Sequence, residues 1–283
     1  MPKEELLFKP SLLVLILSLF FSNLCFAGIY NQSRFKYNSQ IQAGPLCYYL
    51  DYQERENGTV LDKDYGFLYG IHGKLEAKNK KFIFDIKTFI AYTDSATYEG
   101  SSSSGETISF DSEKECIITL QADAGYSVNI GIKVTPYVGI GYRLWRRGEA
   151  KVVQADDGSY VWDYKEIYSW AYIAPGIRLC MPIRNNISIS LDAAYMFAID
   201  PQVTAYFSEI DPAYSDVTLN LSPESAFYVN LPLKIRLSKR LSLHCEAIFR
   251  YWNMGRSNFY LGMYEPHSVT KIYGINVGLG YEF

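Results

Sequence analysis

The chain has 283 residues, a formal net charge of -3 and a mean hydropathy of -0.07, although 48% of its residues are hydrophobic. The lack of a basic excess argues against nucleic acid as a partner. Aromatic residues make up 16% of the chain, yet the only long apolar run lies near its start. Apolar side chains must therefore be spread in alternation rather than gathered into membrane-spanning helices.

Residues 1–27 have the features of a cleavable secretory signal peptide. Lys3 and Lys9 precede the apolar run of residues 12–21, and Ala27 supplies a small residue before the expected cut. This run is half of the roughly twenty residues that a spanning helix needs. We therefore expect an exported protein whose residues 28–283 form one domain.

Four cysteines follow the predicted cut, at positions 47, 116, 180 and 245. No two of them have the spacing of a metal or redox motif. The alternation described below places Cys47 and Cys180 on inward faces and the other two on outward faces. Because a disulfide needs α-carbons within about 7 Å, we expect free thiols.

Segments in which large apolar residues alternate with small or polar ones recur along the chain, as expected for strands with one apolar face. In chain order these segments are 43–54, 65–77, 82–93, 115–127, 132–146, 166–181, 187–199, 226–238, 241–253 and 270–283.

The connections between these ten segments alternate between short and long. Tight turns such as "KNKK" and "IRNN" alternate with connections of ten or more residues. This alternation is typical of a closed, antiparallel, up-and-down transmembrane β-barrel with periplasmic termini and long extracellular loops. Closure, with the tenth strand beside the first, gives every backbone group a partner in lipid.

Charged residues fall on the faces opposite the apolar ones, and these faces would line the barrel lumen. Acidic and basic residues are nearly balanced, with Asp51 also counted as inward, which favours ion pairs over a selective pore. Ten strands should leave a closed or narrow lumen. Bulges are expected at Pro136, Pro175 and Pro232. The predicted lumen charge network is Asp85, Lys87, Asp123, Arg143, Arg178, Asp192, Lys234, Arg236, His244, Glu246, Arg250 and Glu282.

The last segment carries a regular outward pattern that ends on an aromatic residue: Tyr273, Ile275, Val277, Leu279, Tyr281 and Phe283. With this end, residues 28–283 resemble the bacterial outer-membrane β-barrel superfamily. The resemblance implies location in the outer membrane and contact with its lipid and lipopolysaccharide. It also implies a final strand that acts as the insertion signal, read by the barrel-assembly machinery with the help of periplasmic chaperones.

The size class is similar to that of the ten-stranded omptin proteases, whose rim site uses an Asp and a His two residues apart. No histidine in this chain is two residues from an Asp. His267 and Glu265, in the last long connection, are the remaining catalytic candidates. His244 and Glu246 share an inward face, within reach of each other, but no nucleophile is placed beside them.

The residues contain no motif for a cofactor or a metal ion. We therefore expect a non-enzymatic outer-membrane protein with a surface structural or binding role, adhesin-like or envelope-stabilising. The alternatives are an omptin-like protease at the extracellular rim and a narrow passive pore.

The connection over residues 200–225 is acidic and contains no Lys or Arg. Such a loop would attract a basic peptide, or divalent cations that bridge lipopolysaccharide. The extracellular ligand itself is not identified by any motif. The acidic residues of this connection are Asp200, Glu209, Asp211, Asp216 and Glu224.

Overall fold

The alternating segments form long antiparallel strands in the computed structural model, which describes residues 38–101, 105, 107–154, 158, 160–260 and 262–283. The predicted signal peptide lies outside the described residues. The long strands are β1 (Asn38–Glu56), β2 (Thr59–Asn79), β3 (Phe82–Ser101), β4 (Thr107–Tyr126), β6 (Lys133–Arg147), β9 (Glu166–Arg184), β10 (Ile187–Ala205), β12 (Ser222–Arg236), β13 (Leu241–Gly255) and β14 (His267–Glu282).

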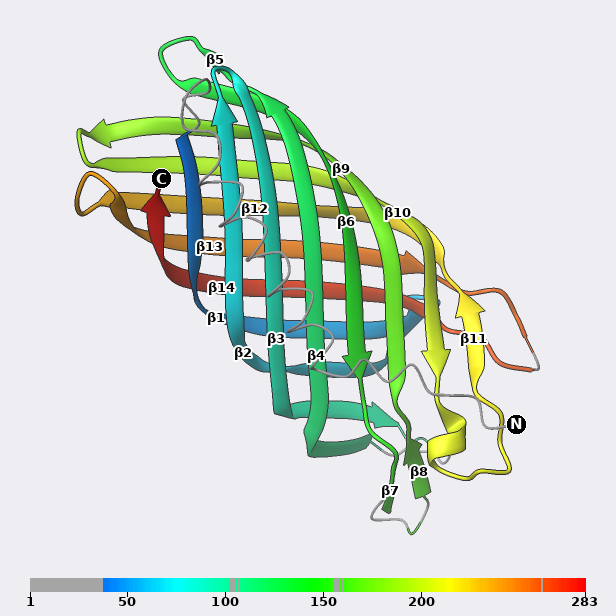
Figure 1. Ribbon diagram of the computed structural model, residues 1–283. Helices are drawn as coiled ribbons and strands as arrows, with labels where there is room; N and C mark the ends of the chain where they lie inside the picture. Colours follow the sequence, from blue (N-terminus) through cyan, green and yellow to red (C-terminus); the bar gives the residue numbers. More distant parts are fainter. Residues whose placement is uncertain (1–37, 102–104, 106, 155–157, 159, 261) are drawn as a thin grey trace, which may run out of the picture. The chain divides into compact units, whose positions relative to one another are not determined.

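These strands pair in chain order and close into a ten-stranded antiparallel barrel. The closing seam joins β1 to β14 from the pair Gln40 and Glu282 to the pair Arg55 and His267. Figure 1 shows β5 (Val128–Asn129) and the C-terminus at one end of the barrel. We call this the short-turn end and the opposite one the long-loop end.

The long-loop end carries the remaining short elements. These are β7 (Lys151–Gln154), β8 (Tyr160–Asp163), the 3₁₀ helix η1 (Phe207–Glu209) and β11 (Val217–Asn220). In Figure 1, β7, β8 and β11 lie together at this end.

The predicted closed barrel of about ten strands is confirmed, and the strands reach farther than the alternation indicated. The expected loop between the first two segments is mostly strand, because β1 and β2 continue to a two-residue turn at Asn57 and Gly58. Both turn residues have positive φ, 50° and 84°, as a tight hairpin turn requires. The long-loop end is thus built largely of extended hairpins.

An apolar girdle covers the outside of the barrel. In β14, Tyr273, Ile275 and Leu279 remain 47%, 48% and 56% exposed. Such a surface suits lipid rather than water. Other exposed members of the girdle are Phe67, Tyr69, Ile71, Phe84, Leu120, Val138, Ile140, Tyr142, Ile173, Ile177, Phe197 and Leu231.

Two predictions about the strands are wrong. In β1 the even-numbered residues face inward, Leu50 being fully buried, so Cys47 and Asp51 lie on the outward face. The alternation misled here because the interior beside β1 is aromatic, and apolar side chains therefore point inward. The expected bulges are also absent, since the strand register stays constant past Pro136, Pro175 and Pro232.

The barrel interior is filled by side chains in three layers. An ionic layer lies toward the short-turn end, an aromatic layer follows it, and an acidic cluster lies at the long-loop end. The aromatic layer is Tyr48, Phe89, Arg143, Trp170, Tyr172, Tyr228, Arg250 and Trp252, all of them buried.

Glycine makes room for this aromatic packing. A Cβ atom added to Gly141 would lie 2.3 Å from Cζ of Tyr172, a fully buried ring whose hydroxyl donates to Gln121 at 3.0 Å. We predict that Gly141→Ala lowers the free energy of unfolding by about 1–3 kcal/mol, because the ring has no room to move. Urea unfolding in detergent micelles measures this change.

Gly73→Ala is the matched control. Its added Cβ would meet Cγ2 of Thr88 at 3.3 Å as its nearest neighbour, a contact that a small shift relieves. A loss as large as that of Gly141→Ala would show that any added methyl group in this sheet is harmful and that the ring contact is not the cause.

Candidate functional site

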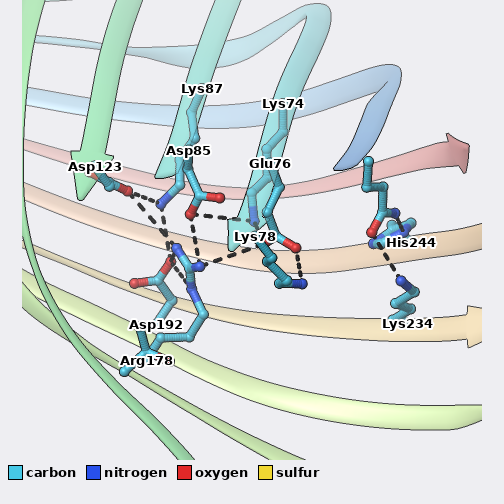
Figure 2. Close-up of polar contacts among 12 residues, drawn as sticks. Lys74, Glu76, Lys78, Asp85, Lys87, Asp123, Arg178, Asp192, Lys234 and His244 are labelled. Atoms are coloured by element: carbon cyan, nitrogen blue, oxygen red, sulfur yellow. Dashed lines mark hydrogen bonds and ion pairs between the residues drawn. The ribbon is translucent and has the colours of Figure 1, made fainter. Parts of the chain in front are cut away.

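The ionic layer is an interlocked set of ion pairs between strands that are distant in sequence. Figure 2 shows Lys87 of β3 between Asp123 of β4 and Asp192 of β10, at 2.8 and 3.1 Å. Arg178 of β9 contacts Asp85 at 2.8 Å and Asp192 at 3.1 Å. These contacts tie both sides of the barrel together across the lumen.

The strand register explains why this layer is interlocked. Glu76, Asp85 and Asp123 face one another directly across β2, β3 and β4, an arrangement of like charges that would be destabilising by itself. Lys74 and Lys87 form the next inward row. The acidic row and the basic row therefore neutralise each other. With Asp192 as the fourth acid, four carboxylates are matched by four cations: Lys74, Lys78, Lys87 and Arg178.

A cavity of about 140 Å³ lies in this half of the lumen. His244 lines it, with Gln40 at 2.6 Å and Ser242 at 2.9 Å as its hydrogen-bond partners. Glu246 instead accepts a hydrogen bond from Asn276 at 2.8 Å. The two candidates that share a face are thus engaged separately.

The structure places the other predicted lumen charges in two surroundings. Lys234 contacts Glu282 at 2.7 Å near the short-turn end, where Arg236 is exposed. Arg143 and Arg250 lie in the aromatic layer, away from the ionic layer. Arg143 stacks on Trp170 and Trp252, and its guanidinium carbon is 5.4 and 5.6 Å from their ring centres.

The aromatic layer occupies the cross-section of the lumen. Trp252 packs edge-on against Trp170 and Tyr172, with ring centres 5.1 and 5.5 Å apart. Tyr48, Tyr172 and Trp252 are at most 2% exposed. Packed rings thus separate the cavity of the short-turn half from the long-loop end.

Arg147 of β6 is the centre of the acidic cluster at the long-loop end. Its Nη1 contacts Glu54 at 2.7 Å and Glu166 at 2.9 Å, and its Nη2 contacts Asp62 at 3.4 Å. Its Nε contacts Asp64, and its plane stacks on Tyr52 at 4.6 Å. One guanidinium group therefore serves four carboxylates.

Further carboxylates complete the cluster. Glu265 accepts hydrogen bonds from the hydroxyls of Tyr168 at 2.6 Å and Tyr52 at 3.3 Å. A second cation, Lys151, contacts Glu113 at 3.1 Å and Asp163 at 3.4 Å. We define the acidic cluster as Glu54, Asp62, Asp64, Glu113, Glu115, Asp163, Glu166 and Glu265, with Arg147 and Lys151 as its cations.

The acidic cluster lies beyond the lipid-facing girdle. Charged residues occupy outward faces at this level, where hydrocarbon would exclude them: Asp51, Lys63, Lys114, Arg146 and Lys271. Each member of the cluster either neighbours one of these charged residues in the chain or lies farther from the girdle than they do. The cluster therefore belongs to the part of the barrel outside the membrane-spanning segments.

Burial changes the protonation of the cluster. It raises the pKa of Glu113 and Glu166 to about 7 and that of Asp64 to about 6, although Arg147 opposes the shift. The pKa of Glu265 is also raised well above its ordinary value, by burial and by the nearby Glu54 and Glu166. Several carboxyl groups therefore hold protons near neutral pH.

These raised values predict that stability falls as the pH rises from about 5 to 8. A folded carboxyl that holds its proton up to about pH 7 stabilises the folded state below the ordinary pKa, and this stabilisation is lost as the pH passes the folded pKa. Urea unfolding across this range measures the slope. The double variant Glu113→Gln and Glu166→Gln should flatten it, and an unchanged slope would contradict the assignment.

The two catalytic candidates of the last connection point to different partners. His267 Nε2 lies 3.4 Å from Glu224 Oε2, and both side chains are partly exposed. Glu265 is buried in the acidic cluster. The structure therefore does not bring His267 and Glu265 together as a pair.

All five acidic residues of the predicted acidic connection lie outside the cluster. Glu209 contacts Lys165, and Asp211 and Asp216 accept backbone hydrogen bonds in exposed turns. The cluster instead comes from strand ends that are far apart in sequence. A sequence signal did exist, because Asp64, Glu113 and Arg147 continue the inward face of their strands beyond the predicted ends.

The described residues contain no helix that is long and apolar enough to span a membrane. Within this same part of the chain, no group of three His, Cys, Asp or Glu side chains is arranged to hold a metal ion. The four cysteines of the barrel are free thiols.

No protein-family model and no curated protein matches the sequence. Among solved structures, the outer membrane protease OmpT from Escherichia coli matches with a TM-score of 0.57 and 10% identity, over 89% of this chain and 99% of that one. The translocator domain of the autotransporter NalP from Neisseria meningitidis matches with a TM-score of 0.43 and 10% identity, over 95% of each chain.

A major outer membrane protein from Thermus thermophilus matches with a TM-score of 0.41 and 13% identity, over 88% of this chain and 100% of that one. At these identities the likeness concerns the fold alone. The closed sheet, the apolar girdle and the likeness to OmpT lead to one conclusion. The chain has the closed β-barrel fold of bacterial outer-membrane proteins such as OmpT.

Proposed function

We propose that the protein is a non-enzymatic, non-conducting surface receptor of the outer membrane, whose long-loop end faces outward and binds a cationic organic group. The observation that carries this proposal is the excess of buried carboxylates in the acidic cluster over its two cations, in a lumen that aromatic side chains fill below. A buried carboxylate is favourable only when it is paired. A cationic ligand would supply the missing partner.

The cavities beside the cluster support an organic cation as the ligand. A cavity of about 210 Å³ is lined by Glu166 and Glu265 and by apolar side chains that include Val203, Leu219 and Met263. A second cavity of about 80 Å³ lies against Glu54, Asp62 and Arg147. Apolar walls with carboxylates beside them suit a long alkyl cation, such as a lysine or arginine side chain of a peptide.

The binding test uses a fluorescent lysine-rich peptide and the protein refolded in detergent at pH 8. The double variant Glu166→Gln and Glu265→Gln should weaken binding about tenfold or more, since it removes desolvated carboxylates. The control is the double variant Asp211→Asn and Asp216→Asn, which removes two exposed carboxylates from the same end. If both double variants lost the same affinity for the peptide, general surface charge would explain the binding, and the proposal would be contradicted.

Conductance separates this proposal from the narrow passive pore. A filled aromatic layer predicts a silent planar bilayer after insertion of the refolded protein. Steady single-channel conductance would overturn the non-conducting role, and the ionic layer would then line a water path.

One geometric observation favours a second candidate, an omptin-like protease at the rim. His267 lies within 3.4 Å of Glu224, and a carboxylate can orient a histidine as a general base. The fold is also similar to that of an outer membrane protease. Cleavage of a fluorogenic basic peptide that disappears in His267→Ala would establish this function in place of the non-enzymatic one.

The location and biogenesis follow from the same proposal. Residues 1–27 would direct export, the termini would lie in the periplasm, and the outward pattern that ends at Phe283 would be the insertion signal for the barrel-assembly machinery. Lipid and lipopolysaccharide would contact the girdle. Deleting Phe283 should reduce assembly into the outer membrane, measured by heat-modifiable gel mobility of membrane fractions.

A further inference from the structure

Two arginines in the aromatic layer have no anionic partner. Arg143 is 1% exposed and Arg250 is 4% exposed. In the part of the chain that the structure describes, neither makes an ion pair, whereas Arg147 and Arg178 each contact several carboxylates. Burying a charge without a partner is strongly unfavourable.

The hydrogen-bonding groups around these arginines are mostly unpaired donors. Nε, Nη1 and Nη2 of Arg143 lack a hydrogen-bond partner, as does Nε of Arg250. The indole nitrogens of Trp170 and Trp252 and the hydroxyl of Tyr48 are also unpaired. Buried polar groups are nearly always satisfied, so unpaired ones indicate a bound water or ion.

The two arginines are near each other in the aromatic layer, where both act electrostatically on Tyr48 and Tyr172. The Arg143 guanidinium stacks on Trp252, which lies two residues from Arg250 on the inward face of β13. Arg250 in turn lies over the rings of Phe89 and Tyr228, at 4.4 and 5.8 Å. The two positive charges repel each other, and this repulsion adds to the cost of burying them.

We infer that Arg143 and Arg250 bind a small monovalent inorganic anion of the halide class within the aromatic layer. Water would satisfy the unpaired donors but would leave two charges without compensation. The ring faces are taken by the guanidinium groups, whereas ring edges and indole N–H groups carry positive partial charge. A weakly hydrated, spherical anion suits such a lining.

This site is independent of the acidic cluster and of the proposed ligand there. The anion would connect β6 to β13 across the lumen and hold the aromatic layer closed. It would be taken up during folding, because packed rings separate the site from the cavities at both ends.

Tryptophan fluorescence provides the first test, since bromide quenches indoles that it contacts. Protein is refolded in sodium bromide or in sodium gluconate of equal concentration and then diluted into one common buffer. Quenching retained by wild-type protein refolded in bromide, and lost in Arg143→Met, is the expected result. Equal fluorescence of the two wild-type samples would mean that only water occupies the layer and would overturn the inference.

Thermal unfolding is the second measurement. Halide at roughly 300 mM during refolding should raise the Tm of wild-type protein by about 3 °C or more over gluconate, a shift typical of a ligand that binds only the folded state. Arg236→Met, which removes an exposed arginine, should keep this increment, whereas Arg143→Met should lose it. If Arg143→Met does not fold, Arg250→Met replaces it. An increment that persists in the variant would contradict the site.

Discussion

Replacing Asp192 by Asn should lower the free energy of unfolding by about 3 kcal/mol, one of the largest effects we expect in this protein. Asp192 is 3% exposed and contacts both Lys87 and Arg178 at 3.1 Å. The ionic layer balances four acids against four cations, so the variant leaves one buried positive charge without compensation. Urea unfolding of the protein refolded in detergent micelles measures the loss.

A second substitution distinguishes charge balance from the loss of one contact. Lys87→Met in the Asp192→Asn background restores the balance and should recover more than half of the lost stability, because a removed pair is tolerated better than a broken one. Glu282→Gln is the partly exposed control: the side chains of Lys234 and Glu282 are 24% and 32% exposed, so their ion pair should contribute less than about 1 kcal/mol. Additive losses in the double variant would contradict the interlocked layer.

The strands and their closure could be predicted from the sequence because lipid requires strict alternation. Within the girdle the outward faces of β10 and β14 are apolar, so side chains such as Ile275 and Leu279 suit only a lipid environment. β1 shows the limit of this inference. Its Leu50 and Tyr52 pack against an aromatic interior. Alternation alone does not distinguish an apolar side chain that faces lipid from one that faces buried aromatic rings.

The contacts of the lumen required the three-dimensional register. Asp85 and Lys87 were recognisable as inward residues, but their partners, Arg178 and Asp192, lie about a hundred residues away, and these contacts depend on how the sheet closes. The acidic cluster was harder to foresee. Arg147 and Asp64 lie on strand extensions beyond the apolar girdle, where the alternation that marks a membrane strand has ended, so they resembled loop residues.

Replacing Arg147 by Met should cost about 3–5 kcal/mol of stability at pH 8 and clearly less at pH 5. Arg147 is the shared cation of Glu54, Asp64 and Glu166, and without it these buried carboxylates repel one another. At pH 5 protons replace the missing cation, since burial already raises the pKa of Glu166 to about 7. Urea unfolding at the two pH values measures the difference.

The control for this experiment is Arg256→Met at the same end of the barrel. Arg256 is 53% exposed and lies 3.7 Å from Glu56, so its removal should change stability by less than about 1 kcal/mol at either pH. If Arg147→Met lowered the free energy of unfolding equally at both pH values, the stacking of Arg147 on Tyr52, and not its charge, would be what stabilises the cluster.

The same variant connects stability to the proposed ligand. Loss of the guanidinium group leaves a site already shaped for a cation, so methylguanidinium or a lysine-rich peptide should restore part of the lost stability at pH 8, whereas tetramethylammonium, which donates no hydrogen bonds, should not. Rescue that also disappears after Glu166→Gln would show that these carboxylates select a hydrogen-bonding cation. If methylguanidinium and tetramethylammonium restored stability equally, charge alone would explain the effect. The acidic cluster would then be a structural element rather than a binding site.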